Sequence, residues 1–179
     1  MKASPPCLIT LVLIGGLAQA IVAVQPPTLT GTWIPDSAAS TQSKELKQAV
    51  QPGAPPAPPA PPATIRDHLP TLRIHHGEPR LTLQFLDADG SVISTTEVTT
   101  DGKENMNSRA GGALVHRSTS RWDGNTLRTD WKIERDAAVV ISGVDRTELT
   151  SADTLVVTTT TEDSKSRSRS TIVYHRAKG

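Results

Sequence analysis

Apolar and polar residues alternate in a series of short runs between Leu72 and Tyr174. Leu72, Ile74 and His76 fall on one face of the first run, and Leu127, Trp131 and Ile133 on one face of a later one. A period of two residues is typical of half-buried β-strands. The pattern therefore predicts eight strands, over residues 72–76, 81–85, 91–100, 113–122, 126–135, 139–149, 154–161 and 167–175.

Three Asp-Gly pairs lie between β-rich runs: Asp89-Gly90, Asp101-Gly102 and Asp123-Gly124. Asp-Gly can place both central residues of a tight turn at positive φ, which matches the twist of a hairpin. Strands joined in this serial way predict an all-β, antiparallel up-and-down meander that closes into a small barrel. The alternative is an open, strongly curved sheet with the segment around Trp33 covering one end.

The chain before the meander divides into three parts. Residues 1–20 are a predicted signal peptide, residues 21–50 an N-terminal segment, and residues 51–63 a Pro/Ala-rich linker; the β-barrel meander occupies 64–179. In the N-terminal segment, residues 30–34 predict a short strand that Pro35 stops, and residues 43–50 a short helix capped by Ser43. The linker holds half of the 14 prolines, which favours an extended spacer.

The N-terminus has the order of an export signal. Lys2 supplies a positive charge, residues 7–17 form an apolar core, and Ala18-Gln19-Ala20 gives the small-x-small cleavage pattern. The apolar run is shorter than the roughly 20 residues that span a bilayer. We therefore expect cleavage after Ala20 and a periplasmic or secreted bacterial protein, with an uncleaved membrane anchor as the alternative.

Composition narrows the function classes further. Cys7 is the only cysteine and leaves with the signal, so the mature chain has no disulfide, thiolate nucleophile or cysteine-based metal site. The formal net charge is +1, and removal of Lys2 brings it near zero. Nucleic acid is therefore not an expected partner, and no later segment is apolar enough for a transmembrane helix.

Four short motifs carry a resemblance to a known group of proteins: Gly31-Thr32-Trp33, residues 71–74, residues 101–104 and residues 121–127. In these motifs the chain resembles bacterial secreted lipocalin-like β-barrel proteins of unknown function. The resemblance implies a lipocalin-like barrel in which Trp33 plugs one end. The long Pro-Ala linker between the Trp33 strand and the meander departs from the pattern of that group.

Aromatic residues are scarce, at 3% of the chain, so each is a candidate for a ligand wall. Trp122, Trp131, Phe85 and Tyr174 are the ligand-binding candidates, because large rings line most small-molecule pockets. Packing in the core is the alternative role for each of them.

Histidines and basic residues give no metal or anion motif. His75 and His76 are neighbours on one strand, so their side chains point to opposite faces and are poorly placed to share a metal. No metal and no cofactor are predicted. Lys165, Arg167 and Arg169 alternate with serines and predict a solvated strand face; pointing inward, they would instead suit an acidic ligand.

Catalytic motifs such as a Gly-x-Ser-x-Gly elbow are absent from the sequence. Asp130, Asp145, Arg146 and Glu148 could place charges inside a barrel, although spacing alone assigns them no role. The sequence therefore predicts an exported barrel, not an enzyme, that binds a small molecule without chemistry. The alternatives are an envelope interaction module with a filled barrel and, less favoured, a hydrolase or isomerase on the same fold.

Overall fold

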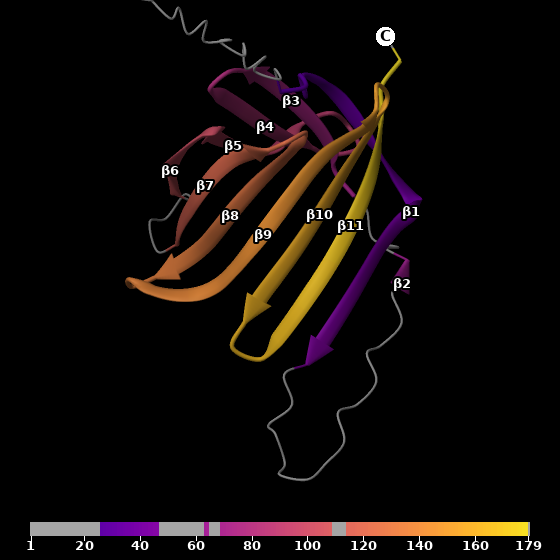
Figure 1. Cartoon of the computed structure of the whole chain (residues 1–179). Helices are drawn as coiled ribbons and strands as arrows, with labels where there is room; N and C mark the ends of the chain where they lie inside the picture. The colour runs from indigo at the N-terminus through magenta and orange to yellow at the C-terminus, as the bar shows by residue number, and fades with distance from the viewer. Residues whose placement is uncertain (1–25, 47–62, 65–68, 109–113, 179) are drawn as a thin grey trace, which may run out of the picture.

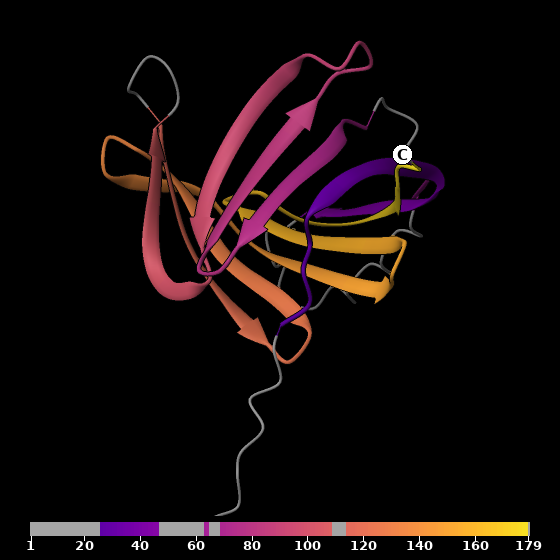
Figure 2. The ribbon, with the colours of Figure 1, turned by 90° about the horizontal axis from the view of Figure 1, so that it is seen from above.

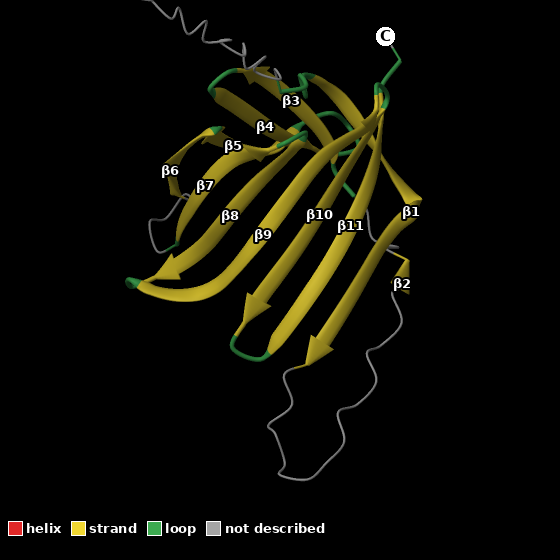
Figure 3. Ribbon diagram, viewed as in Figure 1, coloured by secondary structure: helices red, strands yellow, loops and turns green. Residues whose placement is uncertain are grey.

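The computed structural model describes residues 26–46, 63–64, 69–108 and 114–178, and Figure 1 shows their arrangement. All regular structure in these residues is β-strand (Figure 3). The strands are β1 (Gly31–Leu46), β2 (Ala63–Thr64), β3 (Thr71–Gly77), β4 (Arg80–Leu86), β5 (Val92–Thr99), β6 (Asp101–Ser108), β7 (Val115–Asp123), β8 (Thr126–Arg135), β9 (Ala138–Ser151), β10 (Thr154–Asp163) and β11 (Ser166–Arg176). The predicted signal peptide and all of the linker except Ala63 lie outside the described residues.

One antiparallel sheet contains all the strands, in the order β5-β4-β3-β1-β11-β10-β9-β8-β7-β6, with the two residues of β2 paired to β1. Because β1 pairs with both β3 and β11, the first long strand joins the last, and the meander curves around a common centre (Figure 2). The result is a nearly closed barrel of ten strands, which confirms the all-β antiparallel meander.

Side chains bridge the seam that remains between β5 and β6. The Thr99 amide donates to Asn105 Oδ1 over 3.1 Å, and Asn107 Nδ2 donates to the Glu97 carbonyl over 3.1 Å. The side chains of two asparagines therefore link β5 and β6, whereas backbone ladders join the other neighbouring strands.

The eight predicted strands of the meander are all present, but two predictions in the N-terminal part are wrong. The strand does not stop at Pro35, because β1 continues to Leu46 through a bulge between Asp36 and Thr41. Asp36 Oδ1 accepts the amides of Ala38 and Ala39, at 3.0 and 3.1 Å, so a side chain satisfies the backbone where the ladder is broken.

The predicted helix at residues 43–50 is also wrong in its described part. Residues 43–46 pair with residues 166–169 of β11, so tertiary pairing overrides a weak local preference for helix. The sequence pattern also missed β6, whose polar residues Asp101–Ser108 show no apolar alternation.

The Asp-Gly turns differ in detail from the expectation. Between β7 and β8, Gly124 has a φ of 60°, but Asp123 is the last paired residue of β7 and is not at positive φ. Asp101-Gly102 lies beside a register shift at the start of β6 and not in a hairpin. Two successive positive φ values occur instead at Asp136 and Ala137, between β8 and β9.

The core fills one end of the barrel. Trp33, Leu29 and Leu155 have no exposed surface, and Leu127 and Tyr174 are 2% exposed. Further along the same face of the strands, every second residue is only half-buried. These residues are Trp131, Ile133, Val157, Thr159, Thr161, Ser168, Ser170 and Ile172. We call the face shared by Trp33, Leu127 and these residues the inner face; it is dry at one end and accessible at the other.

Candidate functional site

Trp33 lies at the filled end of the barrel, which is the position expected for an end plug. Its indole Nε1 donates to the Leu29 carbonyl over 3.0 Å, and the Arg176 guanidinium lies 4.2 Å from the ring centroid. Arg176 in turn donates to the Thr30 carbonyl over 2.7 Å. These contacts fix the segment before β1 across the end of the barrel.

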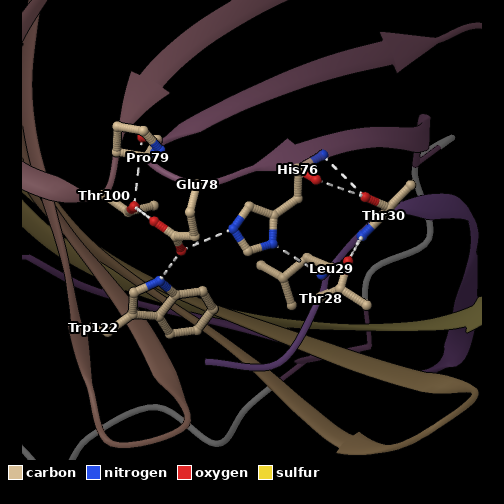
Figure 4. A network of polar contacts seen from close by, with 8 residues as sticks. All are labelled: Thr28, Leu29, Thr30, His76, Glu78, Pro79, Thr100 and Trp122. Carbon is tan, nitrogen blue, oxygen red and sulfur yellow. Dashed lines mark hydrogen bonds and ion pairs between the residues drawn. The ribbon is translucent and has the colours of Figure 1, made fainter. Parts of the chain in front are cut away.

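A polar network closes the same end (Figure 4). Glu78 Oε1 accepts the Trp122 indole N–H over 2.6 Å and pairs with His76 Nε2 at 2.9 Å, while its Oε2 accepts the Thr100 hydroxyl. His76 Nδ1 accepts the Leu29 amide over 3.2 Å, so the ring proton is on Nε2 and is donated to Glu78.

Burial works to raise the pKa of Glu78, but the hydrogen bonds from Thr100, Trp122 and His76 outweigh it and lower that pKa. The carboxylate therefore stays ionised and ties together the β3–β4 turn, the β5–β6 corner, β7 and the segment before β1. This arrangement is architectural, because each of its donors is already paired with an acceptor.

Beyond the core, the inner face of β7–β11 carries two rows of small, mostly polar residues that lie directly opposite one another on neighbouring strands. The first row is Ser120, Thr129, Asp145, Thr159 and Ser170; the second is Ser118, Trp131, Gly143, Thr161 and Ser168. We call these ten residues the inner belt. Its hydroxyls, one carboxylate and one indole provide hydrogen-bonding and stacking groups above a filled core.

The Trp131 ring occupies the space over Gly143, where any side chain would collide with it. A Cβ added to Gly143 would lie 2.4 Å from Trp131 Cζ2 and 2.6 Å from the Thr160 carbonyl oxygen. The indole therefore lies against the backbone of β9. His116 lies beside the same ring, with the two centroids 5.9 Å apart.

The four predicted wall residues do not form one site. Tyr174 belongs to the buried core, and Phe85 and Trp122 pack against it. Trp131 alone lies in the inner belt. Trp122 also has its indole N–H committed to Glu78. A ligand at the open end would therefore reach Trp131 first, and the others contribute to the filled end.

Of the four charged residues considered from the sequence, only Asp145 faces inward. Asp130 pairs with Arg128 on the outer face at 2.6 Å, and Arg146 lies opposite Arg128 on that face. Glu148 lies opposite Thr126, also on the outer face. Alternation on β9 gives this separation, but the sequence does not reveal which set of residues faces the core.

The basic strand shows the solvated arrangement. Arg167 lies opposite Glu162 and Arg169 opposite Thr160, both on the outer face, while Ser166, Ser168 and Ser170 take the inner positions. These arginines therefore do not make the interior suitable for an acidic ligand.

A cavity of about 470 Å³ lies on the outer face of β6–β11. Its charged lining comprises Glu104, Arg117, Asp130, Lys132, Glu162 and Arg167. Arg117 pairs with Glu104 and Glu134, both at 2.8 Å, and Lys132 pairs with Glu134 at 2.8 Å. Three residues of the inner belt, Ser118, Trp131 and Gly143, also line this cavity. In this cavity Arg117 and Lys132 are therefore paired with neighbouring carboxylates, and most of the lining belongs to the outer face.

Histidine placement agrees with the sequence on one point: the side chain of His76 is 4% exposed, whereas neighbouring His75 is exposed on the other face. In the part of the chain that the structure covers, no three His, Cys, Asp or Glu side chains converge as a metal site requires.

Within the residues that the structure describes, no helix has the length and apolar character needed to cross a bilayer.

Comparisons with known proteins give distant likenesses. No protein-family model matches the chain, and no curated protein matches it. Zebrafish ileal bile acid-binding protein complexed with cholic acid is 17% identical, with 83% of this chain and 98% of that chain covered and a TM-score of 0.47. The N57A mutant of the fluorescent protein UnaG is 16% identical, with 84% and 97% covered and a TM-score of 0.47. Likenesses this distant carry no argument about what this chain binds.

Proposed function

We propose that this protein is an exported binding barrel that holds a small molecule at its open end and does not transform it. The observation that carries the proposal is the change in burial along the inner face. On β8, Leu127 is 2% exposed, whereas Trp131 and Ile133 further along the same face are half-buried. Barrels of about eight strands or more have interiors wide enough to hold one small ligand.

The chemistry of the open end suits capture and not catalysis. The inner belt offers hydroxyls from Ser118, Thr159 and Thr161, the Asp145 carboxyl and the Trp131 indole. Such groups orient a ligand by hydrogen bonds and stacking, while the shape of the barrel excludes water. The predicted cleavage after Ala20 supports export, which would put the ligand in the periplasm or the medium.

Native mass spectrometry of the mature protein, purified from its own host, tests both parts of this proposal. We expect a chain that begins at Ile21 and carries a reproducible adduct that is lost on denaturation. A chain that still begins at Met1 would contradict export, and a clean apo mass would count against a tightly held ligand.

Two matched variants place the ligand. Thr161→Trp puts a large ring on the inner face opposite Gly143, while Thr160→Trp puts the same ring on the outer face one residue away. We expect the adduct to disappear in Thr161→Trp and to persist in Thr160→Trp. Equal adducts in the two variants would place the ligand elsewhere.

The second candidate function is an envelope interaction module with a filled barrel. It is favoured by exposed apolar side chains on the two seam strands, where Ile93 is 59% and Met106 is 61% exposed. For this function, Ile93→Glu combined with Met106→Glu abolishes co-purification of an envelope protein. Val139→Glu is the control, since Val139 is 55% exposed on β9, away from the seam.

A further inference from the structure

Asp145 is the only charged side chain among the ten residues of the inner belt. It lies between Thr129 and Thr159 of the neighbouring strands, one row nearer the core than Trp131. The cations of β8 and β9 closest in register, Arg128 and Arg146, are on the other face of the sheet. The barrel wall therefore presents a carboxylate to the interior without an arginine or lysine beside it in the belt.

The contacts of this carboxyl leave one oxygen unused. Burial raises the pKa of Asp145, and hydrogen bonds from Trp131 and Thr159, together with the charge of nearby His116, oppose that rise. Oδ1 is buried and, among the described residues, has no hydrogen-bond partner. An ionised oxygen in this position is costly unless a donor or a cation reaches it.

A second buried group in the belt is also unsatisfied. Ser118 is 2% exposed, and its hydroxyl has no hydrogen-bond partner within the described part of the chain. Ser118 lies directly opposite Trp131, so the indole has an unsatisfied polar group on either side of it. Buried polar groups without partners are rare in folded proteins, so Asp145 and Ser118 mark an unusual part of the inner belt.

We propose that Asp145 and Trp131 form a subsite for a cationic nitrogen, so that the ligand is a small organic amine whose ammonium group pairs with the Asp145 carboxylate. The proposal rests on the binding function proposed above and adds the chemical class of the ligand. The indole supports the same charge, because a cation is attracted to the face of a tryptophan ring. An amine suits this wall better than an acid, since Arg167 and Arg169 of β11 face outward and the inner belt holds no arginine or lysine.

The test compares two probes of the same shape, 2-phenylethylamine and 2-phenylethanol, by NMR titration of the full mature chain. We expect the amine to shift the Trp131 indole and Asp145 amide signals and to bind at least about tenfold more tightly than the alcohol, which corresponds to one hydrogen-bonded charge. Asp145→Asn keeps the shape of the side chain and removes its charge, so it abolishes the preference for the amine. Asp130→Asn, on the outer face, leaves the preference unchanged.

Equal binding of the two probes to the wild type would overturn the proposal, and so would a retained preference for the amine in Asp145→Asn. It would also be overturned if the Trp131 indole signal did not shift at about 10 mM amine, because a dissociation constant above that value is too weak for a specific site. Should Asp145→Asn not fold, the wild-type comparison of the two probes decides the matter. An anionic or neutral adduct in native mass spectrometry would reject the amine and leave the binding function intact, whereas a clean apo mass bears on the binding function itself.

Discussion

Tyr174 is the only tyrosine of the chain, so its ionisation can be followed without interference. The side chain is 2% exposed, and burial raises its pKa to about 12. An unfolded tyrosine titrates near a pKa of about 10. We therefore expect the tyrosinate absorbance of the folded protein to appear near pH 12 and that of the protein in urea near pH 10.

The same shift has a consequence for stability. A folded-state pKa above the unfolded value means that the contribution of Tyr174 to stability is fully present below pH 10 and is lost as the pH rises toward 12. A Tyr174→Phe variant should lose less stability over this alkaline range than the wild type. Titration of the folded protein near pH 10 would contradict the buried position.

Ala137 occupies a backbone conformation that favours glycine. Its φ is 63° and that of Asp136 is 51°, so both central residues of the β8–β9 turn are left-handed. The left-handed conformation destabilises a non-glycine residue by about 1–2 kcal/mol. Glycine avoids this strain, but the greater entropy of its unfolded chain offsets part of the gain. We expect Ala137→Gly to raise the free energy of unfolding by about 1 kcal/mol in urea denaturation.

The neighbouring alanine is the control for this turn. Ala138 is the first residue of β9 and is not at positive φ, so Ala138→Gly gains no relief and weakens the strand. Equal effects of the two substitutions would show that the turn is not strained. The predicted strands place a turn here, but its left-handed conformation was not predicted, because Asp-Ala lacks the glycine that marks such turns.

At the scale of the elements, the network around Glu78 joins four segments that are distant in sequence. Its carboxylate accepts from Thr100, Trp122 and His76, and these bonds lower its pKa despite the opposing effect of burial. A lowered folded-state pKa means that the stabilisation is present above the unfolded value of 4.5 and is lost as the pH falls through the folded value.

We therefore expect the melting temperature of the wild type to fall as the pH drops below about 4.5, with Glu78→Gln showing a weaker dependence over this acidic range. Thermal melts of both proteins between about pH 3 and pH 7 measure the difference. Asp153→Asn is the control, because Asp153 is exposed and meets Arg176 only at 3.9 Å. If the melting temperatures of wild type and Glu78→Gln fall in parallel with pH, Glu78 does not contribute to the loss of stability in acid.

Strands whose inner residues are apolar could be predicted, and strands made mostly of polar residues could not. The alternation of Leu72, Ile74 and His76 is a direct product of burial on one face, and the predicted strand is present. The end of β1 after its bulge and all of β6 are polar strands that pair with β11 and β7, and the side chains of Asp36, Asn105 and Asn107 add hydrogen bonds at the bulge and at the seam. Nothing in local hydropathy reports such contacts.

The candidate site was predicted only in part for a related reason. The aromatic residues were recognised, but large rings serve cores as readily as pockets, and Tyr174 belongs to the core. Asp145 was singled out together with Asp130, Arg146 and Glu148, and the sheet register separates it from them. The polar inner belt could have been suspected from the alternate serines 166, 168 and 170, had the inner face been known.

At the scale of the whole molecule, the seam between β5 and β6 is where the barrel is least tied together. The other neighbouring strands are joined by backbone ladders, whereas the described contacts across this seam include two bonds made by asparagine side chains, Asn105 to Thr99 and Asn107 to Glu97. Local opening starts where the fewest hydrogen bonds are lost. The seam is therefore the place at which the barrel wall would open first.

Amide hydrogen exchange, read by mass spectrometry, tests this distribution of stability. We expect peptides from β5 and β6 to exchange faster than peptides from β10, which is paired on both sides by β9 and β11. Asn107→Ala should accelerate exchange in β5 by about fivefold, the effect of losing one hydrogen bond of about 1 kcal/mol, and leave β10 unchanged. Uniform exchange across β5, β6 and β10 would mean that the barrel opens as one unit and that the seam is no weaker than the rest of the wall.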